Sequence, residues 1–109
     1  MPEDLLPLFR ITHSTDKASE RGVEPLLPEH LEPLAEPRNY GAGRGTPGEG
    51  TRFRLYDGDD NLYFEGTMWS DGSEDEDFAP LEWGRHDSGC AYMKCWEKGP
   101  NGAFGWHVL

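Results

Sequence analysis

The chain has 109 residues, of which 21 are acidic and 10 are Lys or Arg, giving a net charge of −11. This length allows one domain with a single modest core. The hydrophobic content of 35% is low, and 14 glycines with 9 prolines predict that part of the chain is irregular. The negative charge argues against direct contact with nucleic acid and against adhesion to anionic membranes, because both need Lys and Arg.

The first 40 residues are expected to form a short helix and a proline-rich arm. Leu8, Phe9 and Ile11 make an apolar run that is compatible with a short first strand. Ser14 or Thr15 can start a helix that stops at Gly22. Further on, the prolines predict short turns and extended backbone. The leucines of this arm are expected to pin it onto the sheet: Leu26, Leu27, Leu31 and Leu34.

Residues 41–50 predict a flexible linker. The sequence GAGRGTPGEG contains five glycines and no apolar side chain larger than alanine. A G-x-G-x-x-G pattern occurs within it, but no apolar strand precedes this pattern and a proline interrupts the helix that a phosphate-binding loop needs. The linker therefore separates the arm from a core built from residues 51–109, all within one domain spanning 1–109.

Two hairpins are expected in the second half, which holds eleven of the 13 aromatic residues. Residues 52–56 and 62–69 alternate in character and flank the turn sequence DGDDN. Alternation places the apolar side chains of this hairpin on one face and Arg52, Arg54 and Glu65 on the other, where the arginines meet Glu65 at a solvated surface. Residues 90–97 and 103–109 flank KGPNG and predict a second hairpin.

These elements together predict the α+β class. We expect a small twisted antiparallel sheet of about four strands, with a short helix and the proline-rich arm added from the N-terminal half. Residues 70–89 are interpreted as an acidic loop that Phe78, Leu81 and Trp83 anchor.

The excess negative charge is concentrated between Asp57 and Asp87, where eleven acidic residues accompany one base, Arg85. Large aromatic residues interleave with these acids, and aromatic side chains ringed by charge are typical of protein interfaces. We therefore expect this window to bind a basic partner. The candidate partner-binding residues are Asp57, Asp59, Asp60, Tyr63, Glu65, Trp69, Asp71, Glu74, Asp75, Glu76, Asp77, Glu82, Trp83 and Asp87.

Most basic proteins bind nucleic acid, so the expected partner is a nucleic-acid-binding protein whose basic surface this chain occupies and blocks. In size, charge and lack of a catalytic motif the chain resembles small acidic anti-restriction and anti-CRISPR proteins and the immunity proteins of nuclease toxins. No nucleophile elbow or other catalytic motif is present, and a non-enzymatic protein without a cofactor is expected.

Two alternatives stay open. The first is a small zinc-binding protein that uses His86, Cys90, Cys95 and His107, although this spacing lacks the close cysteine pair of compact zinc sites and the two cysteines, five residues apart in one strand, should face opposite sides. The second is an accessory subunit that docks onto a larger assembly through the leucines of the arm. The acidic start MPED and the short apolar run after it do not fit a secretory signal, so a cytoplasmic location is expected.

Overall fold

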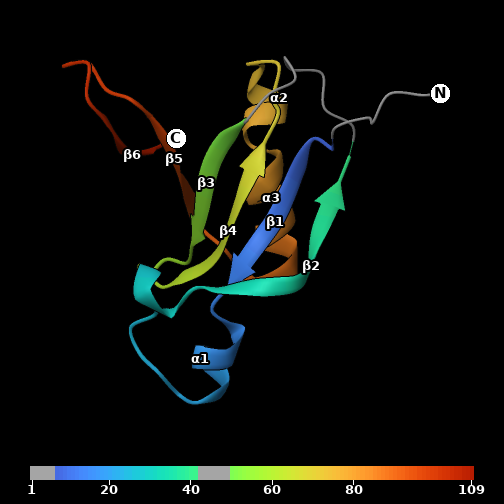
Figure 1. Ribbon diagram of the computed structural model, residues 1–109, viewed down its shortest axis with the longest axis vertical. Coiled ribbons are helices and arrows are strands. Elements are labelled where there is room, and N and C mark those ends of the chain that lie inside the picture. The colour runs from blue at the N-terminus through green and yellow to red at the C-terminus, as the bar shows by residue number, and fades with distance from the viewer. Residues whose placement is uncertain (1–6, 42–49) are drawn as a thin grey trace.

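The computed structural model describes residues 7–41 and 50–109, so most of the linker expected at 41–50 lies outside the described residues. Within these ranges the chain folds into an antiparallel sheet with short helices (Figure 1). The strands are β1 (Phe9–Ser14), β2 (Glu32–Tyr40), β3 (Thr51–Tyr56), β4 (Leu62–Met68), β5 (Tyr92–Lys98) and β6 (Phe104–Val108). The helices are α1 (Asp16–Glu20), α2 (Glu74–Asp77), α3 (Ala79–Ser88) and the 3-10 turn η1 (Pro28–His30).

The sheet is open, and its six described strands lie in the order β2-β1-β4-β3-β5-β6, with every neighbouring pair antiparallel. The α+β class is confirmed, but the prediction of about four strands is wrong. The additional strands are β1 and β2, which come from the first 40 residues. β1 pairs with the edge of β4 that β3 leaves free, and β2 then pairs with β1.

The proline-rich segment contributes β2 as an edge strand. Pro33 and Pro37 both lie within it, and edge strands tolerate proline because one of their two sides needs no backbone donor. The prolines correctly predict extended backbone, but they give no indication that this backbone pairs with β1. The short predicted helix is also found, as α1, and Pro28 opens the 3-10 turn η1.

Both predicted hairpins are present, as β3–β4 and β5–β6. In the first, Arg54 lies opposite Glu65 as alternation predicts. The register shifts between Leu55 and Tyr56, and an extra residue at such a point disturbs the alternation beyond it. Strict alternation would place Tyr63 on the face of Glu65, but after this shift Tyr63 packs against the core.

The core lies between the sheet and α3, which covers one face of it (Figure 1). Gly84 allows this close packing, because a Cβ there would lie 2.9 Å from Cδ1 of Leu55. Both cysteines belong to this one core: Cys90 precedes β5 and so escapes the alternation that predicts opposite faces. The buried cluster is formed by Phe9, Ile11, Phe53, Leu55, Phe64, Met68, Leu81, Cys90, Met93 and Cys95.

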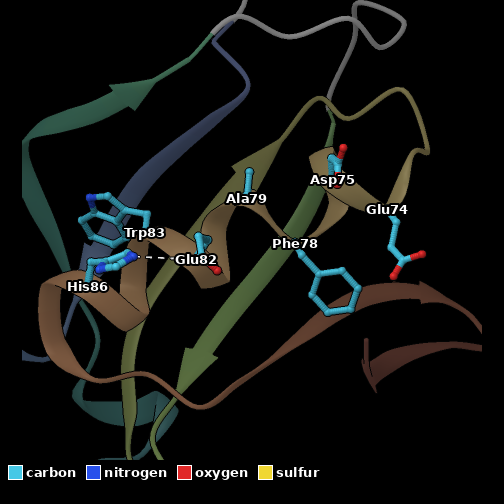
Figure 2. Close-up of a pocket in the computed structure, with 7 residues that line it drawn as sticks. All are labelled: Glu74, Asp75, Phe78, Ala79, Glu82, Trp83 and His86. Atoms are coloured by element: carbon cyan, nitrogen blue, oxygen red, sulfur yellow. Dashed lines mark hydrogen bonds and ion pairs between the residues drawn. The ribbon is translucent and has the colours of Figure 1, made fainter.

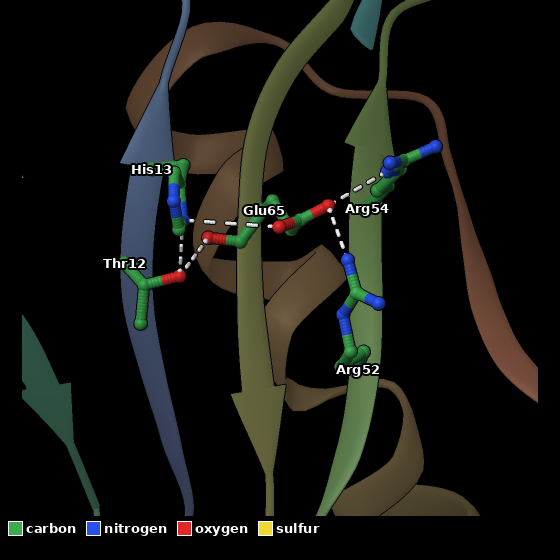
Figure 3. A network of polar contacts seen from close by, with 5 residues as sticks. All are labelled: Thr12, His13, Arg52, Arg54 and Glu65. Carbon is green, nitrogen blue, oxygen red and sulfur yellow. Dashed lines mark hydrogen bonds and ion pairs between the residues drawn. The ribbon is translucent and has the colours of Figure 1, made fainter. Parts of the chain in front are cut away.

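The opposite face of the sheet, from which Glu65, Arg52 and Arg54 project (Figure 3), is called the open face below. The fold is flat, with extents of 45 × 38 × 22 Å, and α3 and the open face lie on opposite sides of the sheet (Figure 1). None of the helices in the described ranges has the length and apolar character that crossing a membrane requires.

Candidate functional site

Most of residues 70–89 fold into α2 (Glu74–Asp77) and α3 (Ala79–Ser88), so the prediction of an acidic loop for this whole segment is wrong. Ser73 is the N-cap of α2, and its side chain accepts a hydrogen bond from the Glu76 amide. Pro80 lies in the first turn of α3, and Gly89 ends this helix in the left-handed region. These residue types favour helix boundaries, and four acids in the first turn of α2 suit the positive end of the helix dipole.

A groove of about 660 Å³ lies along α2 and α3 (Figure 2). Phe78 and Trp83 give it two aromatic surfaces, and both are half-buried. Three carboxylates and no Lys or Arg line it. The lining residues are Glu74, Asp75, Phe78, Ala79, Glu82, Trp83 and His86, and we call this site the acidic groove.

Trp83 is held firmly from the core side of the acidic groove. Its ring centre lies 4.9 Å from that of Phe64, 5.1 Å from that of Tyr40 and 6.2 Å from that of Phe9. These aromatic contacts fix the ring on three strands. The groove therefore has a preformed aromatic wall that costs little conformational entropy on binding.

Glu82 carries the ion pairs of the groove. Its carboxylate lies 3.5 Å from a guanidinium nitrogen of Arg85 and 3.3 Å from Nε2 of His86. All three side chains are more than half exposed, so each pair contributes little to stability. Glu74 and Asp75 are exposed at the start of α2, and the groove as a whole attracts cations.

Three of the predicted acids brace the loop before α2. The Ser70 hydroxyl donates to Oδ1 of Asp77 over 2.6 Å, the Asp71 amide donates to Oε1 of Glu76 over 2.9 Å, and the Ser73 amide donates to Oδ1 of Asp71 over 2.8 Å. These side chains fix the position of α2 next to the acidic groove. Asp87, which is exposed near the end of α3, bonds with the Ser88 hydroxyl.

Another group of predicted acids lies in the turn between β3 and β4, apart from the groove. Asp57 accepts hydrogen bonds from the amides of Asp59 and Asn61 and from the Tyr63 hydroxyl. Burial alone would raise the pKa of Asp57, but these hydrogen bonds outweigh it and lower the pKa below its ordinary 3.8. The hydrogen bond to Asp57 raises the pKa of Tyr63 to about 12.

Asp60 also has a structural role in this turn. It adopts a positive φ of 66°, a conformation that Asp tolerates better than most residues, and it accepts a hydrogen bond from the Tyr92 hydroxyl. Burial, followed by this hydrogen bond, raises the pKa of Tyr92 to about 12. The turn acids thus stabilise the junction of β3, β4 and β5.

Glu65 and Trp69 are buried rather than displayed. Each is 7% exposed. Glu65 bonds with Arg52 and Arg54 on the open face, and the Arg10 guanidinium lies 5.3 Å from the Trp69 ring centre. The structure thus divides the predicted partner-binding residues, and only Glu74, Asp75, Glu82 and Trp83 line the acidic groove.

The four alternative zinc ligands do not gather at one site, although Cys95 and His107 lie opposite each other on β5 and β6. His86 is exposed on α3, whereas Cys90 and Cys95 are buried in the core. Burial, with nearby carboxylates adding to it, raises the pKa of each thiol to about 12, which disfavours the thiolate that zinc needs. Over the described ranges, no group of three or more His, Cys, Asp or Glu residues has an arrangement that could hold a metal ion.

The leucines of the arm are partly used by the fold itself. Leu26 is 5% exposed, and its backbone pairs with Leu62 and with the Asn61 side chain. Leu34 packs against the core, while Leu27 is 39% exposed. The apolar docking surface of the second alternative is therefore much smaller than it would be if all four leucines were exposed.

Some residues of interest are not among the predicted partner-binding residues. Phe78 and His86 line the acidic groove. Phe78 and Glu82 are four residues apart, so a prediction of helix for this segment would also have predicted that they lie on the same face. Lys94, Trp96 and Lys98 alternate on the open face, a pattern visible in the sequence of the second hairpin.

Comparisons with known protein families, with characterised proteins and with solved structures find no match. Function has to be inferred from the side chains of this chain.

Proposed function

We propose that this chain is a non-enzymatic binding protein that holds a basic segment of a partner protein in the acidic groove. The partner is a nucleic-acid-binding protein, and occupation of its basic surface inhibits it. The observation that carries this proposal is the combination, in one groove, of three carboxylates with the aromatic side chains of Phe78 and Trp83.

The two parts of the groove supply different components of binding. The carboxylates accelerate encounter with a positive surface, and this effect weakens as salt screens the charges. Phe78 and Trp83 provide apolar area that a long Lys or Arg stem, or an adjacent apolar side chain, can cover. A solvated acidic surface without the aromatic residues would provide only the first component.

A short arginine-rich peptide with one central leucine is the probe for the groove. We expect it to bind the purified protein, and to bind more tightly than a matched peptide in which glycine replaces the leucine. Affinity should fall steeply between about 0.05 and 0.5 M salt, where the screening length shortens from roughly 14 to 4 Å. Titration calorimetry gives both comparisons.

Charge reversal of Asp75→Lys with Glu82→Lys should weaken peptide binding by at least tenfold. Both residues are exposed, so the fold should persist. The matched control is Glu20→Lys with Glu36→Lys, which makes the same change in net charge at exposed positions outside the groove. Equal weakening by the two double variants would show that binding depends only on net charge and would contradict binding of the peptide in the acidic groove.

The inhibitory part of the proposal needs the partner itself. Proteins captured by the wild-type chain and lost with Asp75→Lys/Glu82→Lys should be nucleic-acid-binding proteins. For each of them, adding the wild-type chain should displace a bound oligonucleotide, and the groove variant should not. A captured protein that binds its oligonucleotide and this chain at the same time contradicts inhibition by occupation.

A further inference from the structure

Half of the cations of this acidic protein lie on one face. The chain has ten Lys and Arg residues. Four of them alternate along the strands with buried side chains, which places them on the open face, away from α3, and a fifth, Lys98, continues the same alternation two residues after Trp96. These are Arg10, Arg52, Arg54, Lys94 and Lys98. The charge of the whole chain therefore does not describe this face.

Exposed aromatic rings stand among these cations. Trp96 is 38% exposed and Phe104 is 60% exposed, with their ring centres 6.4 Å apart and their planes within 19° of parallel. The ring centre of Trp106 lies 5.4 Å from that of Trp96. The guanidinium of Arg54 lies 4.1 Å from the Trp106 ring centre, so a cation–π contact holds the Trp106 ring in place.

A groove of about 700 Å³ runs between the start of β3 and the β5–β6 hairpin. Arg52 and Lys98 line it together with Trp96 and Phe104, and Glu97 contributes one carboxylate. Its remaining lining residues are Gly50, Thr51 and Thr67. Its volume falls in the range of about 300–1,000 Å³ that small-molecule sites occupy.

The acids of α3 act only weakly at this groove. Helix α3, which carries Glu82 and Asp87, covers the other side of the sheet (Figure 1). Electrostatic interactions through solvent decay over roughly 8 Å at physiological salt. On the open face itself Glu65 is already bonded to two arginines. An anion that reaches this face meets a local excess of positive charge.

We propose that this groove and the adjoining open face bind single-stranded nucleic acid. Bases stack on Phe104 and Trp96, and phosphates pair with Arg52, Lys94 and Lys98. Single-stranded nucleic acid is the occupant that uses both features, since every base has a flat π surface and every linkage carries a negative charge. An acidic peptide would use the cations and leave the exposed rings without a stacking partner.

The test uses the full-length protein and fluorescein-labelled oligonucleotides in anisotropy titrations at low salt. Oligothymidylate and oligouridylate separate DNA from RNA as the source of the ligand. An abasic strand of the same length keeps the phosphates and removes the bases, and polyglutamate supplies negative charge alone. We expect the abasic strand to bind at least fivefold more weakly than the better of the two base-containing strands, and polyglutamate more weakly still. With about three phosphates neutralised, log affinity should fall against log salt with a slope near −2.

Two variants locate the site and one controls for charge. Phe104→Ala should weaken oligonucleotide binding at least fivefold and leave binding of the abasic strand unchanged. Lys98→Glu should weaken binding of both strands. Lys17→Glu makes the same charge change on α1, where the side chain is 72% exposed, and should change affinity less than twofold. Near-ultraviolet circular dichroism shows whether each variant keeps the native fold.

Three results would overturn the proposal. One is no binding of either base-containing strand at low salt. Another is equal affinity for oligothymidylate, the abasic strand and polyglutamate, which would identify the face as a general anion surface or a site for an acidic protein. The third is an equal loss of oligonucleotide affinity with Lys17→Glu and Lys98→Glu, which would show that the binding site does not lie on the open face.

Discussion

Arg54 donates a hydrogen bond from Nε to Oε1 of Glu65 over 2.8 Å, across neighbouring strands β3 and β4 (Figure 3). Arg52 approaches the same oxygen at 3.3 Å, and Nδ1 of His13 lies 3.8 Å from the other carboxylate oxygen. The Thr12 hydroxyl contacts both His13 and the backbone oxygen of Glu65. Although alternation predicts the pairing, it places Glu65 at a solvated surface, and the structure leaves this residue only 7% exposed.

Replacing Glu65→Gln should lower the free energy of unfolding by about 1–3 kcal/mol, the range for hydrogen bonds to charged groups. The variant keeps the volume of the side chain but removes the counter-charge of two arginines. Urea unfolding measures the change, and an unaltered slope against urea would show that the denatured state is unaffected.

Arg52→Gln is the matched control for this network. Its side chain is 51% exposed and its contact with Glu65 is longer, so the loss should stay below about 1 kcal/mol. An equal or larger loss for Arg52→Gln would contradict the central position of Glu65.

The two hairpins could be predicted because each is encoded locally. Alternating residues flank a turn-forming sequence, and the pairs Arg54–Glu65 and Trp96–Trp106 follow from the position of that turn. The pairing of β1 with β4 joins residues 50 to 59 positions apart in the sequence, from Ser14–Phe64 to Phe9–Met68, and no turn sequence specifies it. That contact depends on the edge of β4 that β3 leaves free.

The helices next to the acidic groove were predictable in part. Ser73, Pro80 and Gly89 are helix-boundary signals that outweigh the acidic composition used to interpret this segment as a loop. The separation of the acidic residues into turn residues and groove residues could not be predicted in this way, because Asp57 and Asp75 differ in role only through their positions in the fold. Linear charge density is the same for acids that brace a turn and acids that line a groove.

Gly66→Ala should destabilise the protein by about 3 kcal/mol or more, at the upper end for an overpacked site. A Cβ at this position would collide with the Arg10 carbonyl oxygen and lie 2.8 Å from Cζ of Phe53. Neither group can move freely, since one is the backbone of β1 and the other is fully buried. Thermal unfolding, followed by circular dichroism, measures the loss.

Gly58→Ala provides the comparison for Gly66→Ala, because a Cβ at Gly58 meets no atom within 4 Å. Its effect should be within about 0.5 kcal/mol of zero, as for other exposed substitutions. Similar losses at the two glycines would contradict the close approach of β1 to β4.

Asp57 should make the free energy of unfolding depend on pH in the acidic range. Its pKa in the folded protein is below the ordinary 3.8, so the unfolded chain binds the proton more readily. Its contribution to stability is therefore fully present above the unfolded pKa and is lost as the pH falls through the folded pKa. The difference in free energy of unfolding between wild type and Asp57→Asn should be constant above about pH 5 and shrink at lower pH. A difference that stays constant into strong acid would contradict the hydrogen bonds of this turn.

Cys90 and Cys95 should resist alkylation in the native protein. Burial is the largest cause that raises each pKa from 9.0 to about 12, and nearby carboxylates add to it, with Asp87 acting on Cys90 and Glu97 on Cys95. Near pH 8 this lowers the reactive thiolate fraction by roughly a thousandfold. Iodoacetamide labelling followed by mass spectrometry should show slow modification at both positions and rapid modification in urea. Fast native labelling would contradict their burial in the core and would return these thiols to consideration as metal ligands.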